Sequence, residues 1–298
     1  MEHGRRARTA DSRVEVVSRA MRIVTYRSAR GLRAGLLRNG AVADIWASLD
    51  GDGSSVRDLL DSGRLPEVAE IADPRVVPLE TVELLTPVPD PRKIVCIGLN
   101  YRAHAAEAGI EPPEDPTFFA KFSNALAAPG YTVPLPKASE KVDFEAEVAL
   151  VIARRCSAVD EADAPSYIAG YMLFNDLSAR DLQFATPQWM PGKVFDGSAP
   201  CGPALVSPDE ALAKGQISFT LTLNGEEMQS ATTDDLIFGT SELVSRLSSL
   251  MTLEPGDIIS TGTPSGVGST RDPQVWLSPG DEIVINSPSL GRLATRSG

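Results

Sequence analysis

The stretch Asp143-Phe144-Glu145-Ala146-Glu147-Val148-Ala149-Leu150-Val151-Ile152 combines a β-favouring apolar run with two acids near its start. We expect a strand over residues 143–155. Side chains alternate between the faces of a strand, so Glu145 and Glu147 point the same way, roughly 7 Å apart along the strand. Carboxylates that share a site repel each other, and the apolar residues that follow indicate a buried setting with little screening. A divalent cation would compensate, and carboxylate oxygens suit Mg²⁺, Mn²⁺ or Ca²⁺. We therefore predict an oxygen-only metal site. The alternative is that both acids lie on a solvated strand face.

A third acid follows a second apolar strand. Tyr171–Asn175 reads as a buried strand, and Asp176 comes directly after it. We predict that Asp176 joins Glu145 and Glu147 as a metal ligand. The nearby Asp181 is assigned a structural role, because Ser178 to Asp181 fits a capping box in which the acid reaches back to the first amide of a helix.

Five further polar side chains could face a substrate. Arg180 and Gln183 lie three residues apart on the expected helix and could present donors to a carboxylate. Arg180 could equally be a simple ion-pair partner. Lys121 is flanked by aromatic residues and could point inward rather than extend to solvent. Lys193 lies in a loop, and Thr263 lies in a loop of small residues that can offer amides and hydroxyls to a ligand.

Histidine is scarce, which narrows the possible chemistry. The chain has two histidines, and His3 lies near the N-terminus, so His104 is the one in the expected folded body. A histidine-rich zinc site is therefore excluded. On a short helix expected to begin after Asn100, its N-cap, and to end at Gly109, Glu107 lies three residues after His104 and shares its face. A carboxylate beside an imidazole orients it as a general base for water. A surface His–Glu pair of no consequence is the alternative.

Composition excludes several classes of protein. The 298 residues are 42% hydrophobic and 23% charged, as in ordinary globular proteins. The net charge of −12 argues against nucleic acid or an anionic membrane as a partner, since both select basic surfaces. The three dispersed cysteines predict reduced, buried thiols and a cytoplasmic protein. No apolar run is long enough to span a membrane.

Two further motifs of common enzyme classes are absent or incomplete in the sequence. The G-x-S-x-G element of α/β-hydrolases is absent from the sequence. The nearest candidate for a dinucleotide-binding loop, residues 266–271, lacks the third glycine and a following helix pattern. We therefore assign no cofactor to it.

The chain divides into three parts. Residues 1–20 are arginine-rich without an apolar run, so we expect a disordered extension rather than a signal peptide. Residues 21–88 predict a small N-terminal α/β domain with a hairpin at Asn39-Gly40. A proline-rich linker, Thr86–Pro91, leads to the main domain, residues 89–298. That domain is expected to be rich in strands, with a hairpin at Asn224-Gly225. It also contains a helix whose apolar residues share one face: Leu243, Val244, Leu247, Leu250 and Met251.

Taken together, these motifs resemble the fumarylacetoacetate hydrolase family, in particular its short bacterial and FAHD-like members. The resemblance covers about residues 90 to 295 and rests on five segments in a fixed order. They are Gly98-Leu99-Asn100-Tyr101 with His104-x-x-Glu107, the Asp143–Glu147 strand, Asn175 to Gln183, the Lys193 loop, and Thr261-Gly262-Thr263-Pro264. One departure is Val194, where many members have serine.

The resemblance implies an α+β, mostly β fold with a mixed β-roll catalytic domain, usually as a homodimer. It implies Mg²⁺ or Mn²⁺ on Glu145, Glu147 and Asp176, and a water-activating pair of His104 and Glu107. Lys193 would stabilise the enolate, and Lys121, Arg180, Gln183 and Thr263 would contact the substrate.

The implied activity is hydrolysis of a C–C bond in a small 2,4-dioxo acid such as an acylpyruvate. Three alternatives stay open: decarboxylation of an oxaloacetate-like 2-oxo acid, isomerisation of a 2-oxo-enoate, and a non-catalytic ligand-binding homologue.

Overall fold

Two adjacent apolar strands, β11 (Ala146–Ile152) and β12 (Ile168–Asn175), form the centre of the molecule, here a computed structural model that describes residues 20–72 and 74–298. Every residue of both strands is buried. They pair antiparallel, with Glu147 opposite Phe174. Alternate side chains of β11 enter different hydrophobic clusters: Val148 and Leu150 on one face, Ala149 and Val151 on the other. A strand covered on both faces requires the continuous apolar run seen in the sequence.

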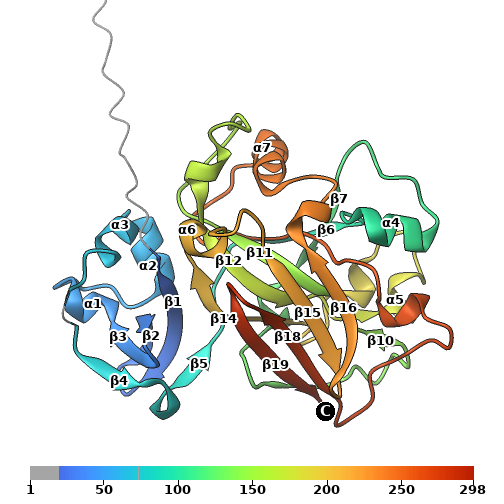
Figure 1. The fold of residues 1–298 in the computed structure, drawn as a ribbon, viewed down its shortest axis with the longest axis horizontal. Helices are drawn as coiled ribbons and strands as arrows, with labels where there is room; N and C mark the ends of the chain where they lie inside the picture. The colour runs from blue at the N-terminus through green and yellow to red at the C-terminus, as the bar shows by residue number, and fades with distance from the viewer. Residues whose placement is uncertain (1–19, 73) are drawn as a thin grey trace, which may run out of the picture.

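The large sheet extends from this centre in both directions, in the order β4-β3-β2-β1-β14-β12-β11-β17-β6-β7, with β5 paired to β1 and β8 to β14 (Figure 1). Its pairings are mixed: β17 runs parallel to β6, and most other pairs are antiparallel. The remaining strands of this sheet are β1 (Arg22–Ser28), β2 (Gly31–Arg38), β3 (Ala41–Asp44), β4 (Val76–Pro78), β5 (Glu83–Leu85), β6 (Ile94–Gly98), β7 (Thr117–Lys121), β8 (Leu126–Ala127), β14 (Ala199–Val206) and β17 (Ile258–Ser260).

A five-stranded sheet, in the order β16-β15-β18-β19-β9, packs against one face of the large sheet (Figure 1). Its members are β9 (Thr132–Val133), β15 (Ser218–Leu223), β16 (Glu226–Thr232), β18 (Glu282–Ser287) and β19 (Gly291–Ser297). The hairpin between β15 and β16 turns at Asn224 and Gly225, whose φ angles are 51° and 87°. A two-residue Asn-Gly hairpin turn needs positive φ at both residues, so the predicted hairpin is confirmed. A two-stranded ladder joins β10 (Val142–Asp143) to β13 (Ser178–Ala179).

Helices are short and lie around the sheets. They are α1 (Ile45–Ser48), α2 (Val56–Asp61), α3 (Leu65–Val68), α4 (Arg102–Ala108), α5 (Arg180–Gln183), α6 (Pro208–Ala211) and α7 (Thr240–Leu250). Short 3₁₀ turns are η1 (Leu79–Thr81), η2 (Ser123–Ala125), η3 (Ala164–Tyr167), η4 (Met190–Gly192), η5 (Thr233–Asp235) and η6 (Gly268–Thr270). The α+β, mostly β fold predicted from sequence is confirmed. None of the helices in residues 20–72 and 74–298 is long and apolar enough to cross a membrane.

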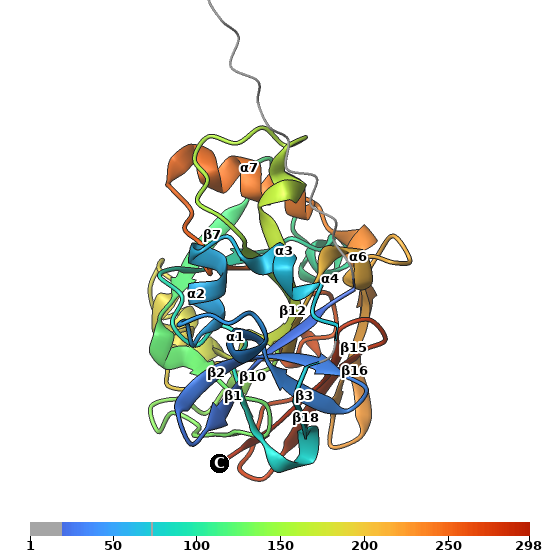
Figure 2. The same ribbon diagram turned by 90° about the vertical axis from the view of Figure 1, so that its left-hand side faces the viewer.

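The unit of residues 21–88 is built from β1 to β5 and α1 to α3, which Figure 2 shows nearest the viewer. Its hairpin at Asn39-Gly40 has the expected positive φ angles. Strand β1 also pairs with β14 of the main body, Ile23 opposite Leu205, so the large sheet crosses the expected linker. The predicted disordered extension, residues 1–20, lies outside the described residues except for Ala20.

Four local predictions differ from the structure. The expected continuous strand from 143 to 155 is interrupted at residues 144–145, where the amide of Glu145 donates to the Asn175 side chain (3.0 Å). Helix α4 begins after Tyr101, not after Asn100. On α7, Leu250 is 68% exposed because it lies at the last turn, beyond the buried face.

The capping box expected at residues 178–181 is also wrong. The Ser178 hydroxyl donates to the Asp176 carbonyl (2.7 Å), and α5 begins after Ala179 without a side-chain cap. Asp181 instead accepts hydrogen bonds from the Ser139 hydroxyl (2.5 Å) and the Glu140 amide (3.0 Å). Asp181 thus has a structural role, as expected, but it stabilises the neighbouring loop at Ser139 and Glu140 rather than the start of its own helix.

Candidate active site

Three buried carboxylates meet where β11 and β12 begin and end. One oxygen each of Glu145, Glu147 and Asp176 lies within 4.8 Å of the others. Glu147 belongs to β11, Glu145 immediately precedes that strand, and Asp176 follows β12. The Asp176 amide donates to the Glu145 carbonyl (2.9 Å), which fixes the two chain segments beside each other. The convergence of the three acids predicted from sequence is therefore present in the fold.

Two buried lysines face these acids. Lys193 Nζ lies 2.7 Å from Glu145 Oε2 and 2.9 Å from Asp176 Oδ2. Lys121 Nζ lies 2.6 Å from Asp176 Oδ1. Burial opposes the charge on Lys193, but Asp176 and Glu145 outweigh it and raise the lysine pKa. The Lys193 ammonium is therefore held charged at the acids. Lys121 is buried with its Nζ against Asp176, so the expectation that it points inward agrees with its position.

An aromatic layer supports Lys193. Its Nζ lies 4.9 Å from the centre of the Phe119 ring, and that ring packs edge-on against Trp189 at 5.9 Å. Trp189 lies directly against Gly98, where an added Cβ would come within 2.3 Å of the indole. The aromatic stack thus links Lys193 to the end of β6, the strand that leads into α4.

Glu147 has a different environment from the other two acids. It accepts hydrogen bonds from the Ser260 hydroxyl and the Gly262 amide (3.0 Å), which are neutral donors. Burial, with repulsion from Asp176 and Glu145, raises the pKa of Glu147 well above its usual value. At Glu145 burial acts in the same direction, but Arg180 and Lys193 outweigh it and lower the pKa.

These residues fit a hard divalent cation. The donor set is oxygen-only, buried and preassembled, which suits Mg²⁺, Mn²⁺ or Ca²⁺. With Asp143 included, four buried carboxylates face the two ammonium groups and the Arg180 guanidinium, so one formal negative charge is uncompensated. The raised pKa of Glu147 is in keeping with this imbalance. A bound cation would supply the missing charge.

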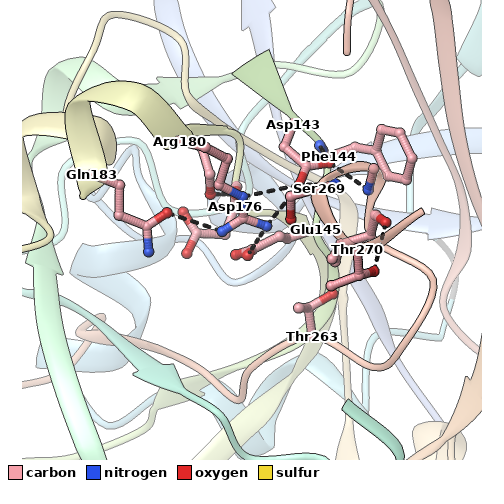
Figure 3. A network of polar contacts seen from close by, with 12 residues as sticks. Asp143, Phe144, Glu145, Asp176, Arg180, Gln183, Thr263, Ser269 and Thr270 are labelled. Carbon is pink, nitrogen blue, oxygen red and sulfur yellow. Dashed lines mark hydrogen bonds and ion pairs between the residues drawn. The ribbon is translucent and has the colours of Figure 1, made fainter. Parts of the chain in front are cut away.

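Arg180 is held between acids from two segments (Figure 3). Its Nη2 lies 2.8 Å from Asp143 Oδ2 and 2.7 Å from Glu145 Oε1, and its Nη1 donates to Gln183 Oε1 (3.0 Å). Asp143 in turn accepts from the amides of Gly268 (2.7 Å) and Ser269 (3.1 Å). Burial opposes the charge on Arg180, but Glu145 and Asp143 raise its pKa. In this structure Arg180 is thus an ion-pair partner, the alternative noted from sequence. Its contact with substrate, and that of Gln183, stay predictions.

His104 and Glu107 form the expected pair on α4. His104 Nδ1 lies 3.0 Å from Glu107 Oε2, and their side chains are 15% and 23% exposed. Burial would raise the pKa of Glu145, but Arg180, Lys193 and, more weakly, His104 lower it. The imidazole therefore lies close enough to the acids to act on them electrostatically. The pair sits at the edge of the site, where solvent has access.

Thr263 supports the backbone beside the acids. Its hydroxyl donates to the Ala146 carbonyl (3.0 Å) and accepts from Gln229 Nε2 (2.9 Å). Gln229 also accepts from the Ala146 amide (2.8 Å) through Oε1. Thr263 is thus beside the predicted ligands, and a contact from it to substrate stays a prediction.

Three residues of this network had no role assigned from sequence: Asp143, Gln229 and Ser260. Asp143 lies within the acidic motif, and its proximity to Glu145 was a usable signal. Gln229 and Ser260 reach the site from distant strands, with sequence separations of 83 and 113 residues from their partners Ala146 and Glu147. No local pattern marks such contacts.

Comparisons with known proteins agree with the geometry. Residues 93–296 match the family described as "Fumarylacetoacetate (FAA) hydrolase C-terminal". A Dictyostelium discoideum protein named fumarylacetoacetate hydrolase domain-containing protein 2 homolog is 39% identical over 278 residues, covering 88% of this chain and 91% of that protein. The Bos taurus protein named oxaloacetate tautomerase FAHD2A, mitochondrial, is 42% identical over 218 residues, covering 72% of this chain and 69% of its own.

A solved structure is similar across nearly the whole chain. It is described as a probable 2-hydroxyhepta-2,4-diene-1,7-dioate isomerase from Mycobacterium abscessus, with a TM-score of 0.80 and 33% identity. The match covers 94% of this chain and 98% of that structure. The cytoplasmic location and the homodimer expected from sequence stay predictions, since the bovine relative is named as mitochondrial and a single chain is described here.

Proposed function

The chain belongs to the fumarylacetoacetate hydrolase family, as its motifs predicted, and we propose that it catalyses enol–keto tautomerisation of a small 2-oxo acid such as oxaloacetate. The observation that carries the proposal is the convergence of Glu145, Glu147 and Asp176 with two buried lysines. With a divalent cation bound, such a site would stabilise the enolate form of the substrate more than the keto form, because the enolate carries more negative charge on the 2-oxo oxygen. The names of the relatives support the choice of tautomerase or isomerase chemistry over the hydrolysis expected first.

The acids would hold Mg²⁺ or Mn²⁺, which when bound would act as a Lewis acid toward the 2-oxo oxygen. Lys193 would donate a hydrogen bond to the oxygen that gains charge as the enolate forms, because its ammonium already lies between Glu145 and Asp176. Arg180, held by Asp143, would keep Glu145 ionised and fixed in direction. These groups are prearranged, so little reorganisation accompanies the change in charge.

His104 would move the proton. With Nδ1 paired with Glu107, Nε2 would be the nitrogen that acts as the base. In the keto-to-enol direction the C3–H bond breaks and the proton passes to Nε2, while the electron pair forms the C2–C3 double bond and the carbonyl π pair moves to the 2-oxo oxygen. That oxygen then takes a proton from solvent, and the protonated imidazole releases its proton to solvent. The reverse sequence returns the proton to C3.

Hydrolysis of a 2,4-dioxo acid is the second candidate, and the His104–Glu107 pair favours it. The same imidazole could take a proton from water, which would then attack the distal carbonyl and release a carboxylate and a 2-oxo acid. Decarboxylation of oxaloacetate requires the enolate to be stabilised but no base for water, so loss of His104 would spare it.

The test uses three assays on the Mn²⁺-loaded protein: ketonisation of enol-oxaloacetate, pyruvate release from oxaloacetate, and cleavage of an acylpyruvate. We expect fast ketonisation in the wild type, loss of activity in Glu145→Ala, and roughly a 100-fold to 10,000-fold loss in His104→Gln. His3→Gln, the other histidine, is the matched control. Near-wild-type turnover in Glu145→Ala would refute the metal assignment. Cation binding without turnover in any assay would identify a ligand-binding homologue.

A further inference from the structure

The loop of residues 266–271, which the sequence left without a role, contacts both halves of the active site. The amide of Gly266 donates to Glu107 Oε1 (2.9 Å). The amides of Gly268 and Ser269 donate to Asp143, which holds Arg180 (Figure 3). One short segment therefore touches the proton-transferring pair and, separately, the ion pair beside the acids.

Glu107 is fixed at both carboxylate oxygens. Oε2 faces His104 Nδ1 (3.0 Å), and Oε1 accepts from the Gly266 amide. A carboxylate held at one oxygen can rotate about its last torsion, whereas one held at both cannot without losing a bond. The direction of the imidazole thus depends on where the Gly266 amide points.

Arg271 holds Gly266 in place. Its Nε donates to the Gly266 carbonyl (3.1 Å) and its Nη2 to the Met228 carbonyl (2.6 Å), so the loop is tied to β16. Gly266 has a φ of +97°, and a Cβ there would lie 2.2 Å from the Met228 carbonyl oxygen. The backbone is therefore pressed against Met228, in a conformation that glycine adopts readily.

We propose that Arg271 is a positioning residue: through Gly266 it orients Glu107 and so fixes the tautomer and direction of His104. The proposal rests on the proposed function for its kinetic consequence, but its structural consequence does not. With Arg271 in place the proton of the neutral imidazole stays on Nδ1 and Nε2 is free to act as the base.

The first test reads the imidazole directly. The Mg²⁺-loaded full chain is labelled with ¹⁵N-histidine, and spectra are taken at a pH where the imidazoles are neutral. The sequence has only two histidines, so His3→Gln assigns the signals. We expect His104 to show a single Nδ1–H tautomer in the wild type and a mixture of both tautomers in Arg271→Ala. An unchanged His104 signal in Arg271→Ala overturns the proposal, whether or not the protein turns over any 2-oxo acid.

The second test is a double-mutant cycle in the ketonisation assay. Arg271→Ala should lower kcat roughly 10- to 100-fold with KM little changed. In a Glu107→Gln background the same substitution should cost almost nothing further, because both act through one path. Additive losses would instead assign Arg271 a general structural role and overturn the proposal.

Two controls separate positioning from folding. Arg38→Ala removes a similar arginine-to-carbonyl contact, Nη1 to Ile71 (2.7 Å), far from the site, and should leave kcat unchanged. Added guanidinium should restore part of the activity of Arg271→Ala but not of Glu107→Gln. If Arg271→Ala does not fold, Arg271→Lys takes its place: lysine can reach one carbonyl but not both, so an intermediate loss of kcat is expected, and full wild-type activity in it refutes the proposal.

Discussion

At the scale of single residues, the three clustered acids differ in what compensates their charge. Glu145 is matched by Arg180 and Lys193, and Asp176 by Lys121 and Lys193. Glu147 accepts hydrogen bonds from neutral groups, and its pKa is raised by burial and by the other two acids. An ionised Glu147 is therefore unfavourable in the metal-free protein and favourable once a cation is present.

This difference predicts opposite effects of one substitution. Glu147→Gln should leave the metal-free protein at least as stable as the wild type, since a neutral side chain of similar shape replaces a poorly compensated charge. The same change should weaken Mn²⁺ binding by at least about 100-fold, because it removes a ligand rather than an outer partner. Thermal melts in a chelator and calorimetric titration with Mn²⁺ measure the two effects. Exposed Glu114→Gln is the control, and a fall in metal-free stability together with unchanged Mn²⁺ affinity would contradict the assignment.

The residues of the site differ in how well the sequence predicted their positions. Alternation along the expected strand predicted that Glu145 and Glu147 lie together, and they do, although Glu145 lies just before β11 rather than within it. The end of a second strand was enough to add Asp176. Lys121 was anticipated from its aromatic neighbours. The ion pair between Arg180 and Asp143 was not anticipated. Asp143 is held in place by backbone amides far away in the sequence, for example that of Gly268, 125 residues further on. Side-chain contacts between distant segments leave no periodic trace in the sequence.

At the scale of elements, strands were predicted well and their interruptions were not. The apolar runs of β11 and β12 follow from burial on both faces. The break before β11 arises from the Asn175 side chain, which takes the amide that a continuous strand would pair with a backbone carbonyl. A local rule such as the capping box failed near here because Asp181 finds donors in a tertiary neighbour, Ser139.

The short helix α1 offers a test of stability against pH. Asp44 caps it, accepting from the Ala47 amide (2.9 Å), and pairs with Arg33 through both oxygens (2.7 and 2.8 Å). Burial would raise the pKa of Asp44, but the bonds from Arg33 and Ala47 outweigh it and lower the pKa below its usual value. A lowered carboxylate pKa contributes stability that is present above the unfolded value, about 3.9, and is lost as pH falls through the folded value.

We therefore expect Asp44→Asn to lower the free energy of unfolding by about 1–3 kcal/mol at pH 7. The difference in unfolding free energy between variant and wild type should stay constant down to about pH 4 and become smaller below it, as the wild-type carboxylate takes up a proton. Urea titrations at pH 7, 5, 4 and 3 measure it, with exposed Asp52→Asn as the control. A difference in unfolding free energy that grows as the pH falls would contradict the lowered pKa of Asp44.

At the scale of the whole molecule, the boundary expected at the proline-rich linker does not separate two cores. One cluster of buried side chains contains Ile23 and Trp46 from the small unit together with Met172 and Ile258 from the main body. The backbone joins them too, through β1 on β14. Composition and proline content identify a linker, but they cannot show whether the sheet continues past it, because pairing partners lie far apart in sequence.

This shared core predicts that the chain unfolds in one cooperative step. Neither part can open without exposing apolar surface of the other, so a state with only the small unit unfolded should not accumulate. The three tryptophans allow a test within one protein, since Trp46 lies in the small unit and Trp189 and Trp276 lie in the main body. In the double variant Trp189→Phe, Trp276→Phe, fluorescence reports Trp46 alone while far-UV circular dichroism reports the whole chain. We expect the two urea transitions to coincide, and the matched variant Trp46→Phe should give the same agreement for the main body. A Trp46 transition at clearly lower urea than the dichroism transition would show that residues 21–88 unfold as a domain of their own, as first expected from sequence, and that the β1–β14 pairing adds little to their stability.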